Sequence, residues 1–122
     1  MHLIYPDVAR NRLHLIFVGV VDKASGRAVL RDVKAALKIL PRGFDLLTDL
    51  RDMKSLSRDS EAYIKSIMAL FGAHGIKRIA RILHEPTDDF GFKLMSYFHY
   101  GPKVPIVICS NLEEALKQLV EE

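Results

Sequence analysis

The sequence has very little cysteine and no long apolar run, and both absences narrow the class of protein. A single cysteine, Cys109, among 122 residues excludes an internal disulfide and a zinc site built from several cysteines. Its apolar surroundings, 104–109, predict a small buried residue. No apolar stretch approaches the roughly 20 residues of a membrane-spanning helix. Charges at positions 7, 10 and 12 interrupt any secretory signal, so we expect a cytoplasmic protein.

A strong charge bias is also missing. Lysine and arginine number 18 against 15 acidic residues, which leaves a formal net charge of +3. These cations are spread along the chain, whereas nucleic-acid binders usually gather them on one face, so we expect no nucleic-acid partner. The chain contains no glycine-rich phosphate loop, His-Glu-x-x-His or Gly-x-Ser-x-Gly motif. The sequence therefore indicates no catalytic residues, no cofactor and no metal site.

The segment 44–53 is the one around which the rest of the chain is arranged. It is apolar enough for an inner strand, and Asp49 interrupts it near its carboxyl end. A polar loop, 54–60, follows and leads into a helical pattern that ends at Phe71. In open α/β sheets, ligands and partners gather where a strand passes through such a loop into a helix. We therefore expect Asp49, Arg58 and Asp59 to belong to a partner-binding loop.

The remaining chain alternates between the two-residue period of strands and the 3.6-residue period of helices. The first two strands, 2–5 and 13–21, are predicted to form an antiparallel hairpin, with the first strand at a sheet edge because Pro6 lacks an N–H. Residues 22–26 are predicted to be a loop. Ser57 or Asp59, Thr87 or Asp88, and Ser110 or Asn111 are candidate caps of the later helices.

The resulting order is β-β-α-β-α-β-α-β-α, with further strands at 76–83 and 104–109. It predicts one α/β domain spanning residues 1–122. Strands that alternate with helices pair in parallel through right-handed crossovers, so the helices should pack on the sheet. The initial hairpin adds an antiparallel N-terminal edge strand.

Three passages resemble the STAS fold of sulfate transporters and anti-sigma factor antagonists. Residues 13–19 resemble its second strand, which closes with a glycine, and residues 44–52 resemble its "LLxDL" strand. Residues 77–82 and 105–119 resemble the fourth strand and the final strand and helix of the SpoIIAA-like branch, which is also described as STAS/SEC14-like. The resemblance implies a non-catalytic regulatory domain that acts through protein–protein interaction.

In anti-sigma factor antagonists, the loop after this strand carries Asp-Ser-Ser/Thr-Gly, and a partner kinase phosphorylates its hydroxyl. This chain reads Ser57-Arg58-Asp59-Ser60-Glu61, so the Asp-Ser pair is present and the following Ser/Thr-Gly is missing. The resemblance carries the phosphoacceptor to Ser60, with Ser57 as its neighbour, and implies an anti-sigma factor-like kinase as partner. A plain helix-capping role for both serines is the alternative.

The predicted third helix carries more apolar and aromatic surface than one buried stripe requires. Such an excess is typical of a homodimer face or of a pocket for an apolar small molecule. We prefer the homodimer, and a lipid-binding, SEC14-like carrier is the alternative function. The residues concerned are Phe90, Phe92, Met95, Tyr97, Phe98 and Tyr100.

A third hypothesis is an enzyme that uses His84 together with Asp88. His84 follows a predicted strand and has acidic neighbours, a combination that suits acid–base chemistry or metal binding. A solvated loop that caps the next helix explains the same residues, so we rank this hypothesis last.

Overall fold

The computed structural model describes residues 1–85 and 104–120. Within these residues, the elements in chain order are β1 (His2–Asp7), β2 (Arg12–Val21), α1 (Lys23–Leu37), β3 (Asp45–Leu56), the 3-10 turn η1 (Arg58–Ser60), α2 (Glu61–Ala73), β4 (Arg78–Ile82), β5 (Ile106–Cys109) and α4 (Leu112–Gln118).

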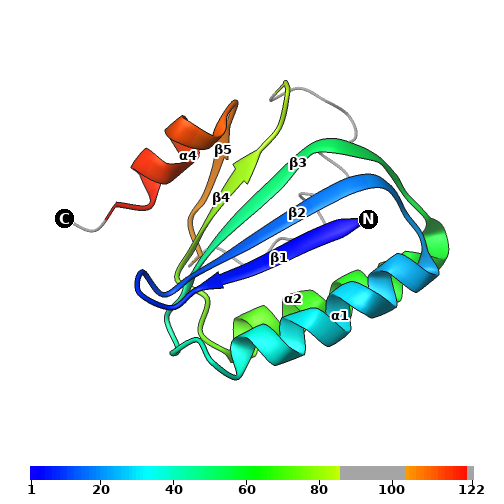
Figure 1. Cartoon of the computed structure of the whole chain (residues 1–122), viewed down its shortest axis with the longest axis horizontal. Helices are drawn as coiled ribbons and strands as arrows, with labels where there is room; N and C mark the ends of the chain where they lie inside the picture. The colour runs from blue at the N-terminus through cyan, green and yellow to red at the C-terminus, as the bar shows by residue number, and fades with distance from the viewer. Residues whose placement is uncertain (86–103, 121–122) are drawn as a thin grey trace.

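The described strands form one mixed sheet in the order β1-β2-β3-β4-β5. β1 pairs antiparallel with β2, and the other three pairings are parallel. The predicted α/β fold and its antiparallel edge strand are thereby confirmed. Helices α1 and α2 lie side by side on one face of the sheet, whereas α4 lies on the other face, against β4 and β5 (Figure 1).

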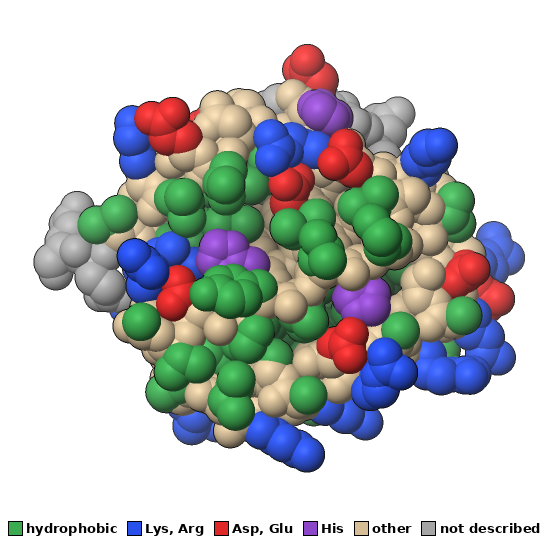
Figure 2. All heavy atoms as spheres, in the orientation of Figure 1, with side chains coloured by type: hydrophobic (Ala, Val, Ile, Leu, Met, Phe, Trp, Pro, Cys, Tyr) green, Lys and Arg blue, Asp and Glu red, His purple; other side chains and the backbone are tan. Residues whose placement is uncertain are grey.

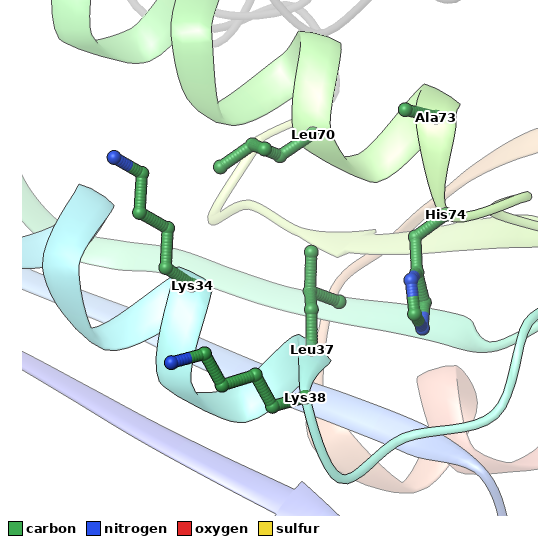
Figure 3. A pocket seen from close by; sticks show the side chains of 6 residues that line it. All are labelled: Lys34, Leu37, Lys38, Leu70, Ala73 and His74. Carbon is green, nitrogen blue, oxygen red and sulfur yellow. The ribbon is translucent and has the colours of Figure 1, made fainter.

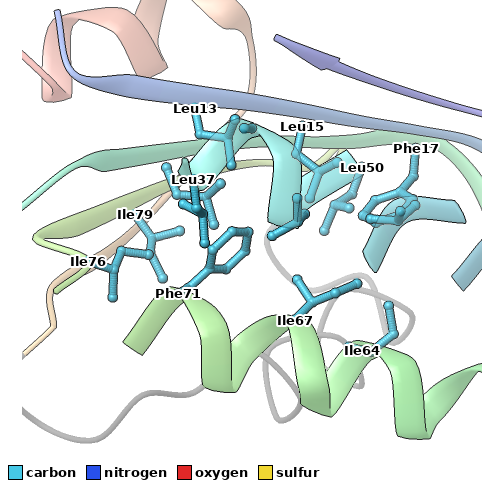
Figure 4. Packing of buried hydrophobic residues seen from close by; sticks show 14 of the residues in the cluster. Leu13, Leu15, Phe17, Leu37, Leu50, Ile64, Ile67, Phe71, Ile76 and Ile79 are labelled. Atoms are coloured by element: carbon cyan, nitrogen blue, oxygen red, sulfur yellow. The ribbon is translucent and has the colours of Figure 1, made fainter. Parts of the chain in front are cut away.

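The main hydrophobic core fills the space between the sheet and the α1–α2 layer. Figure 4 shows apolar side chains from β2, β3 and β4 meeting those of α1 and α2. Phe71 of α2 and Phe44 are both fully buried in it, with ring centroids 5.7 Å apart. A smaller cluster lies beneath α4, where Leu47, Cys109 and Leu119 are buried, so the expected burial of Cys109 is confirmed.

The prediction that residues 22–26 form a loop is wrong, because α1 begins at Lys23. Asp22 is the N-cap, and its carboxylate accepts hydrogen bonds from the backbone N–H and the hydroxyl of Ser25, both at 2.9 Å. An aspartate that satisfies the free N–H groups of the first turn starts a helix even where the sequence lacks an apolar stripe. Gly26 is helical and buried, because α1 packs closely on its neighbours there.

β3 runs to Leu56, beyond the predicted strand end at residue 53. It stays paired with β2 because two irregularities in the register, between Ile16 and Val18 and between Gly19 and Val20, keep the two strands aligned. Gly19 has φ +75°, a left-handed conformation that glycine adopts without strain. In both irregularities the extra residue lies on β3, so β3 carries the bulges and Gly19 of β2 faces one of them.

The predicted cap of the last helix is confirmed by hydrogen bonds. Asn111 caps α4 by accepting from the backbone N–H of Glu114 at 2.8 Å, while the Glu114 carboxylate accepts from the N–H of Ser110 at 3.2 Å. Gly75, which follows α2, has φ +71°, the closing conformation that favours glycine. Among the described helices, none is long and apolar enough to cross a bilayer.

Candidate functional site

Asp49 lies inside β3, which continues to Leu56, so the prediction that it interrupts the strand near its carboxyl end is wrong. It is held by a neighbour on its own strand. Its carboxylate accepts from the Arg51 side chain at 3.0 and 2.8 Å, and from the Arg51 backbone N–H at 3.1 Å. Burial alone would raise the pKa of Asp49, but these hydrogen bonds outweigh it and hold the pKa below its ordinary value. Asp49 is thus a charged, paired carboxylate within β3, where it is paired with Ile16 of β2 and Ile82 of β4.

The loop after β3 is the 3-10 turn η1, and its two serines differ sharply in accessibility. Ser60 is fully buried, and its hydroxyl donates to the carbonyl of Ser57 at 2.7 Å. Ser57 is partly exposed, and its hydroxyl donates to the carboxylate of Asp59. Arg58 and Asp59 are both exposed. The predicted loop 54–60 is shorter in the structure, because β3 runs to Leu56, and only tertiary packing separates the accessible serine from the buried one.

The expectation that Ser57 or Asp59 begins the second helix by side-chain capping is wrong. η1 precedes α2, and neither Ser57, the N-cap of η1, nor Ser60, the N-cap of α2, makes a side-chain capping bond. The carboxylate of Asp59 instead accepts a hydrogen bond from the hydroxyl of Ser57. The loop is held by tertiary contact rather than by a local cap.

That contact is with Gly26 of α1. A Cβ atom placed on Gly26 would lie 3.1 Å from Cβ of Tyr63 and 3.5 Å from Cβ of Ser60. The missing side chain lets α1 approach the start of α2 closely enough to cover Ser60. At the rim, Arg27 donates to the Tyr63 hydroxyl at 3.3 Å and lies 5.9 Å from the centre of its ring. Sequence reasoning missed Gly26, although a glycine in the first turns of a helix was the available signal.

His84 follows the end of β4 and does not build an enzyme-like site within the described residues. It is exposed, and its charge helps to lower the pKa of Asp49. Within residues 1–85 and 104–120, no group of three or more histidine, cysteine or acidic side chains is arranged to hold a metal. Asp88 and the aromatic set between Phe90 and Tyr100 lie outside the described residues, so these two hypotheses stay predictions.

A groove between α1 and α2 is a second candidate site, and the sequence did not single it out. It has a volume of about 460 Å³, and Leu37, Leu70 and Ala73 form its apolar lining. Figure 3 shows Leu37 and Leu70 reaching toward each other from the two helices, with Lys34 and Lys38 along α1 beside them. The available signal was a pair of lysines four residues apart that flanks a core leucine.

No family model and no curated protein matches the sequence, but solved structures match it over nearly its whole length. A DUF3478-family protein from Shewanella loihica PV-4, described as having a SpoIIAA-like fold, superposes with a TM-score of 0.76 at 17% identity and covers 98% of this chain and 94% of its own. The Bacillus cell fate determinant SpoIIAA in its phosphorylated form gives 0.65 at 14% identity, covering 98% and 100%. This protein has the SpoIIAA-like fold.

A further match to the SpoIIAA-like fold of this chain comes from the complex of the diguanylate cyclase SiaD with its activator SiaC from Pseudomonas aeruginosa. Its TM-score is 0.54 at 17% identity, and 91% of this chain and 93% of the matched chain are covered. The resemblance inferred from residues 13–19, 44–52, 77–82 and 105–119 is thus confirmed at the level of the fold. The phosphoacceptor and the partner-binding loop stay predictions, now with a defined geometry around η1.

Proposed function

We propose that this SpoIIAA-like protein is a non-catalytic regulatory domain whose partner protein binds the exposed side of η1. The observation that carries the proposal is the loop itself: Arg58 and Asp59 project into solvent from a turn fixed between β3 and α2. A rigid base with exposed charges favours specific recognition, because little conformational entropy is lost on binding. Matching structures of SpoIIAA, and of SiaC or its cyclase, come from regulatory proteins, which supports the same reading.

The test exchanges the loop charges and measures binding. Wild-type protein and the double variant Arg58→Glu, Asp59→Lys are used to capture partners from a lysate of the source organism. Each captured protein is then purified and titrated by calorimetry. We expect the loop variant to bind at least about tenfold more weakly, which corresponds to about 1.4 kcal/mol. Lys117→Glu on α4, an exposed charge change on the opposite face, is the matched control. Equal binding by wild type and loop variant would reject this surface.

Phosphorylation, if the partner is a kinase, is proposed at Ser57 before Ser60. Ser57 is partly exposed, whereas Ser60 is fully buried against α1 and is reached only after η1 opens. A phosphate on Ser57 replaces the hydroxyl that donates to Asp59 by a dianion, so attraction becomes repulsion. Phosphorylation of Ser57 would therefore open η1 and expose Ser60. Peptide mass spectrometry after incubation with the candidate kinase shows whether Ser57 is phosphorylated before Ser60. If Ser60 of a Ser57→Ala variant is phosphorylated at the wild-type rate, the proposed order is wrong.

The groove between α1 and α2 supports a second candidate function, the carriage of an apolar molecule with an anionic head. Its lining is apolar and its rim carries Lys34 and Lys38, a combination that suits a fatty acid. Native mass spectrometry of the purified protein distinguishes this function from the first. A copurified lipid that is lost in a Leu70→Trp variant supports it, and repeated spectra of the bare protein count against it.

A further inference from the structure

A separate cleft lies on the face of the sheet that α1 and α2 leave uncovered. Its floor is the β1–β2 hairpin, where Tyr5 is paired with His14 and Asp7 is paired with Arg12. Its wall is formed by Leu116 of α4 and by Val120, which follows that helix. The volume is about 360 Å³, at the lower end of the roughly 300–1,000 Å³ typical of ligand sites. Figure 2, which views the molecule from the β1 edge, shows apolar side chains and histidines exposed there.

Arg12 is the feature that marks the cleft as a binding site. It is only 7% exposed, and Nη2 donates to the carbonyl of Leu119 at 3.2 Å. Within the described residues, its Nε is buried without a hydrogen-bond partner. A guanidinium offers five N–H donors, and a buried cation with so few acceptors is costly. An anion that enters the cleft would supply both charge and acceptors to this side chain.

The charges around the cleft favour a monoanion. Asp7 accepts a hydrogen bond from Arg10 at 3.1 Å. The lining thus contains two arginines, Arg10 and Arg12, and one carboxylate, which leaves a net charge of +1. Burial would raise the pKa of Asp7, but the hydrogen bonds from Arg10 hold it below its ordinary value, so Asp7 stays ionised. Burial, together with the charge of Arg12, lowers the pKa of His14, which is therefore neutral at neutral pH.

The rest of the cleft suits an apolar body. The rings of Tyr5 and His14 lie 5.6 Å apart at 59° to each other, and Leu116 and Val120 face the same hollow. A planar carboxylate matches the fork of a guanidinium better than a dianionic phosphate, whose second charge would lie unpaired beside Asp7. We propose that this cleft binds a small organic carboxylate with an aromatic or short aliphatic body, through Arg12, Tyr5 and His14.

The test is an NMR titration of the isotope-labelled protein with three probes: indole-3-acetate, 4-phenylbutyrate and hexanoate. Each is compared with its neutral amide, which has nearly the same shape and no charge. We expect at least one carboxylate to shift the backbone signals of Tyr5, His14 and Leu116 saturably, and its amide to bind at least about tenfold more weakly. Equal shifts by acid and amide would overturn the proposal, as would no saturable shift with any of the three acids. Saturation by inorganic phosphate at the same signals would overturn the choice of an organic carboxylate.

Matched variants on α4 locate the site. Leu116→Trp fills the cleft and should abolish the saturable shifts, whereas Leu112→Trp places the same side chain on an exposed position of the same helix and should preserve them. Arg12→Lys keeps the charge but loses the planar fork, so we expect binding about tenfold weaker. Binding that survives Leu116→Trp unchanged refutes the location. The regulatory proposal is unaffected by any of these outcomes, because η1 and α4 lie on different parts of the molecule.

Discussion

The close approach of α1 to the start of α2 gives a sharp test, because two helical glycines of this chain have opposite surroundings. In helix interiors, replacing glycine by alanine normally stabilises a protein by about 0.5–1 kcal/mol. At Gly72 of α2, an added Cβ would meet nothing within 4 Å, so Gly72→Ala should show this gain. At Gly26, the same methyl would lie 3.1 Å from Cβ of Tyr63, an atom fixed to the backbone of α2.

Overpacking a well-packed contact costs about 1–3 kcal/mol. Set against the helix-propensity gain, this makes Gly26→Ala neutral to about 2 kcal/mol destabilising. The difference in unfolding free energy between the two variants should therefore be about 1–3 kcal/mol, with Gly72→Ala the more stable. Urea unfolding, followed by circular dichroism, measures the unfolding free energy of both variants and of wild type. The comparison requires that the dependence of this free energy on urea concentration is the same for all three proteins. A double variant should be additive, because the two positions share no contact.

The same pair of variants decides whether the reasoning about η1 holds. If Gly26→Ala is stabilised as much as Gly72→Ala, then α1 separates from α2 at no cost, and Gly26 is not what keeps Ser60 buried. If Gly26→Ala is destabilised and its η1 amides also exchange with solvent faster, the glycine holds the loop closed. Hydrogen exchange at residues 58–60 is the additional measurement.

Three further predictions concern buried or paired groups. Asp45, whose side chain is 5% exposed, accepts hydrogen bonds from Arg78 at 2.8 and 3.0 Å. Asp45→Ala should therefore lower the unfolding free energy, measured in urea titrations, by about 3–5 kcal/mol. A loss below about 1 kcal/mol would refute a buried pair. Burial and the charge of Glu114 raise the pKa of Cys109, so the folded protein should react with a thiol reagent far more slowly than the unfolded chain, and equal rates would place the thiol at the surface. The pKa of Asp49 is lower in the folded protein than its unfolded value of 3.8, so ionised Asp49 stabilises the fold at any pH above 3.8. This stabilisation is lost as the pH falls through the folded pKa. The stability gap between wild type and Asp49→Asn should therefore shrink from about pH 5 to about pH 2, and a constant gap would contradict it.

Local rules were enough for most of the architecture. The strand-and-helix alternation, the edge position of the first strand next to Pro6 and the cap at Asn111 each depend on a few neighbouring residues, and each is confirmed. The start of α1 was misplaced because its cap, Asp22, precedes residues without an apolar stripe. Even the fold family was recognisable, since its motifs are short apolar patterns that a sequence displays directly.

The sequence by itself determined the order of the described elements, the cap of α4 at Asn111 and the presence of a polar loop after β3. Only the tertiary structure decided which serine is accessible, that Asp45 neutralises Arg78, and that Arg12 reaches the carbonyl of Leu119. The physical reason is chain separation: the first of these contacts joins residues on α1 and α2, the second spans 33 residues and the third 107. Propensity and periodicity describe a residue's near neighbours, whereas burial and pairing depend on segments that meet only when the sheet has formed.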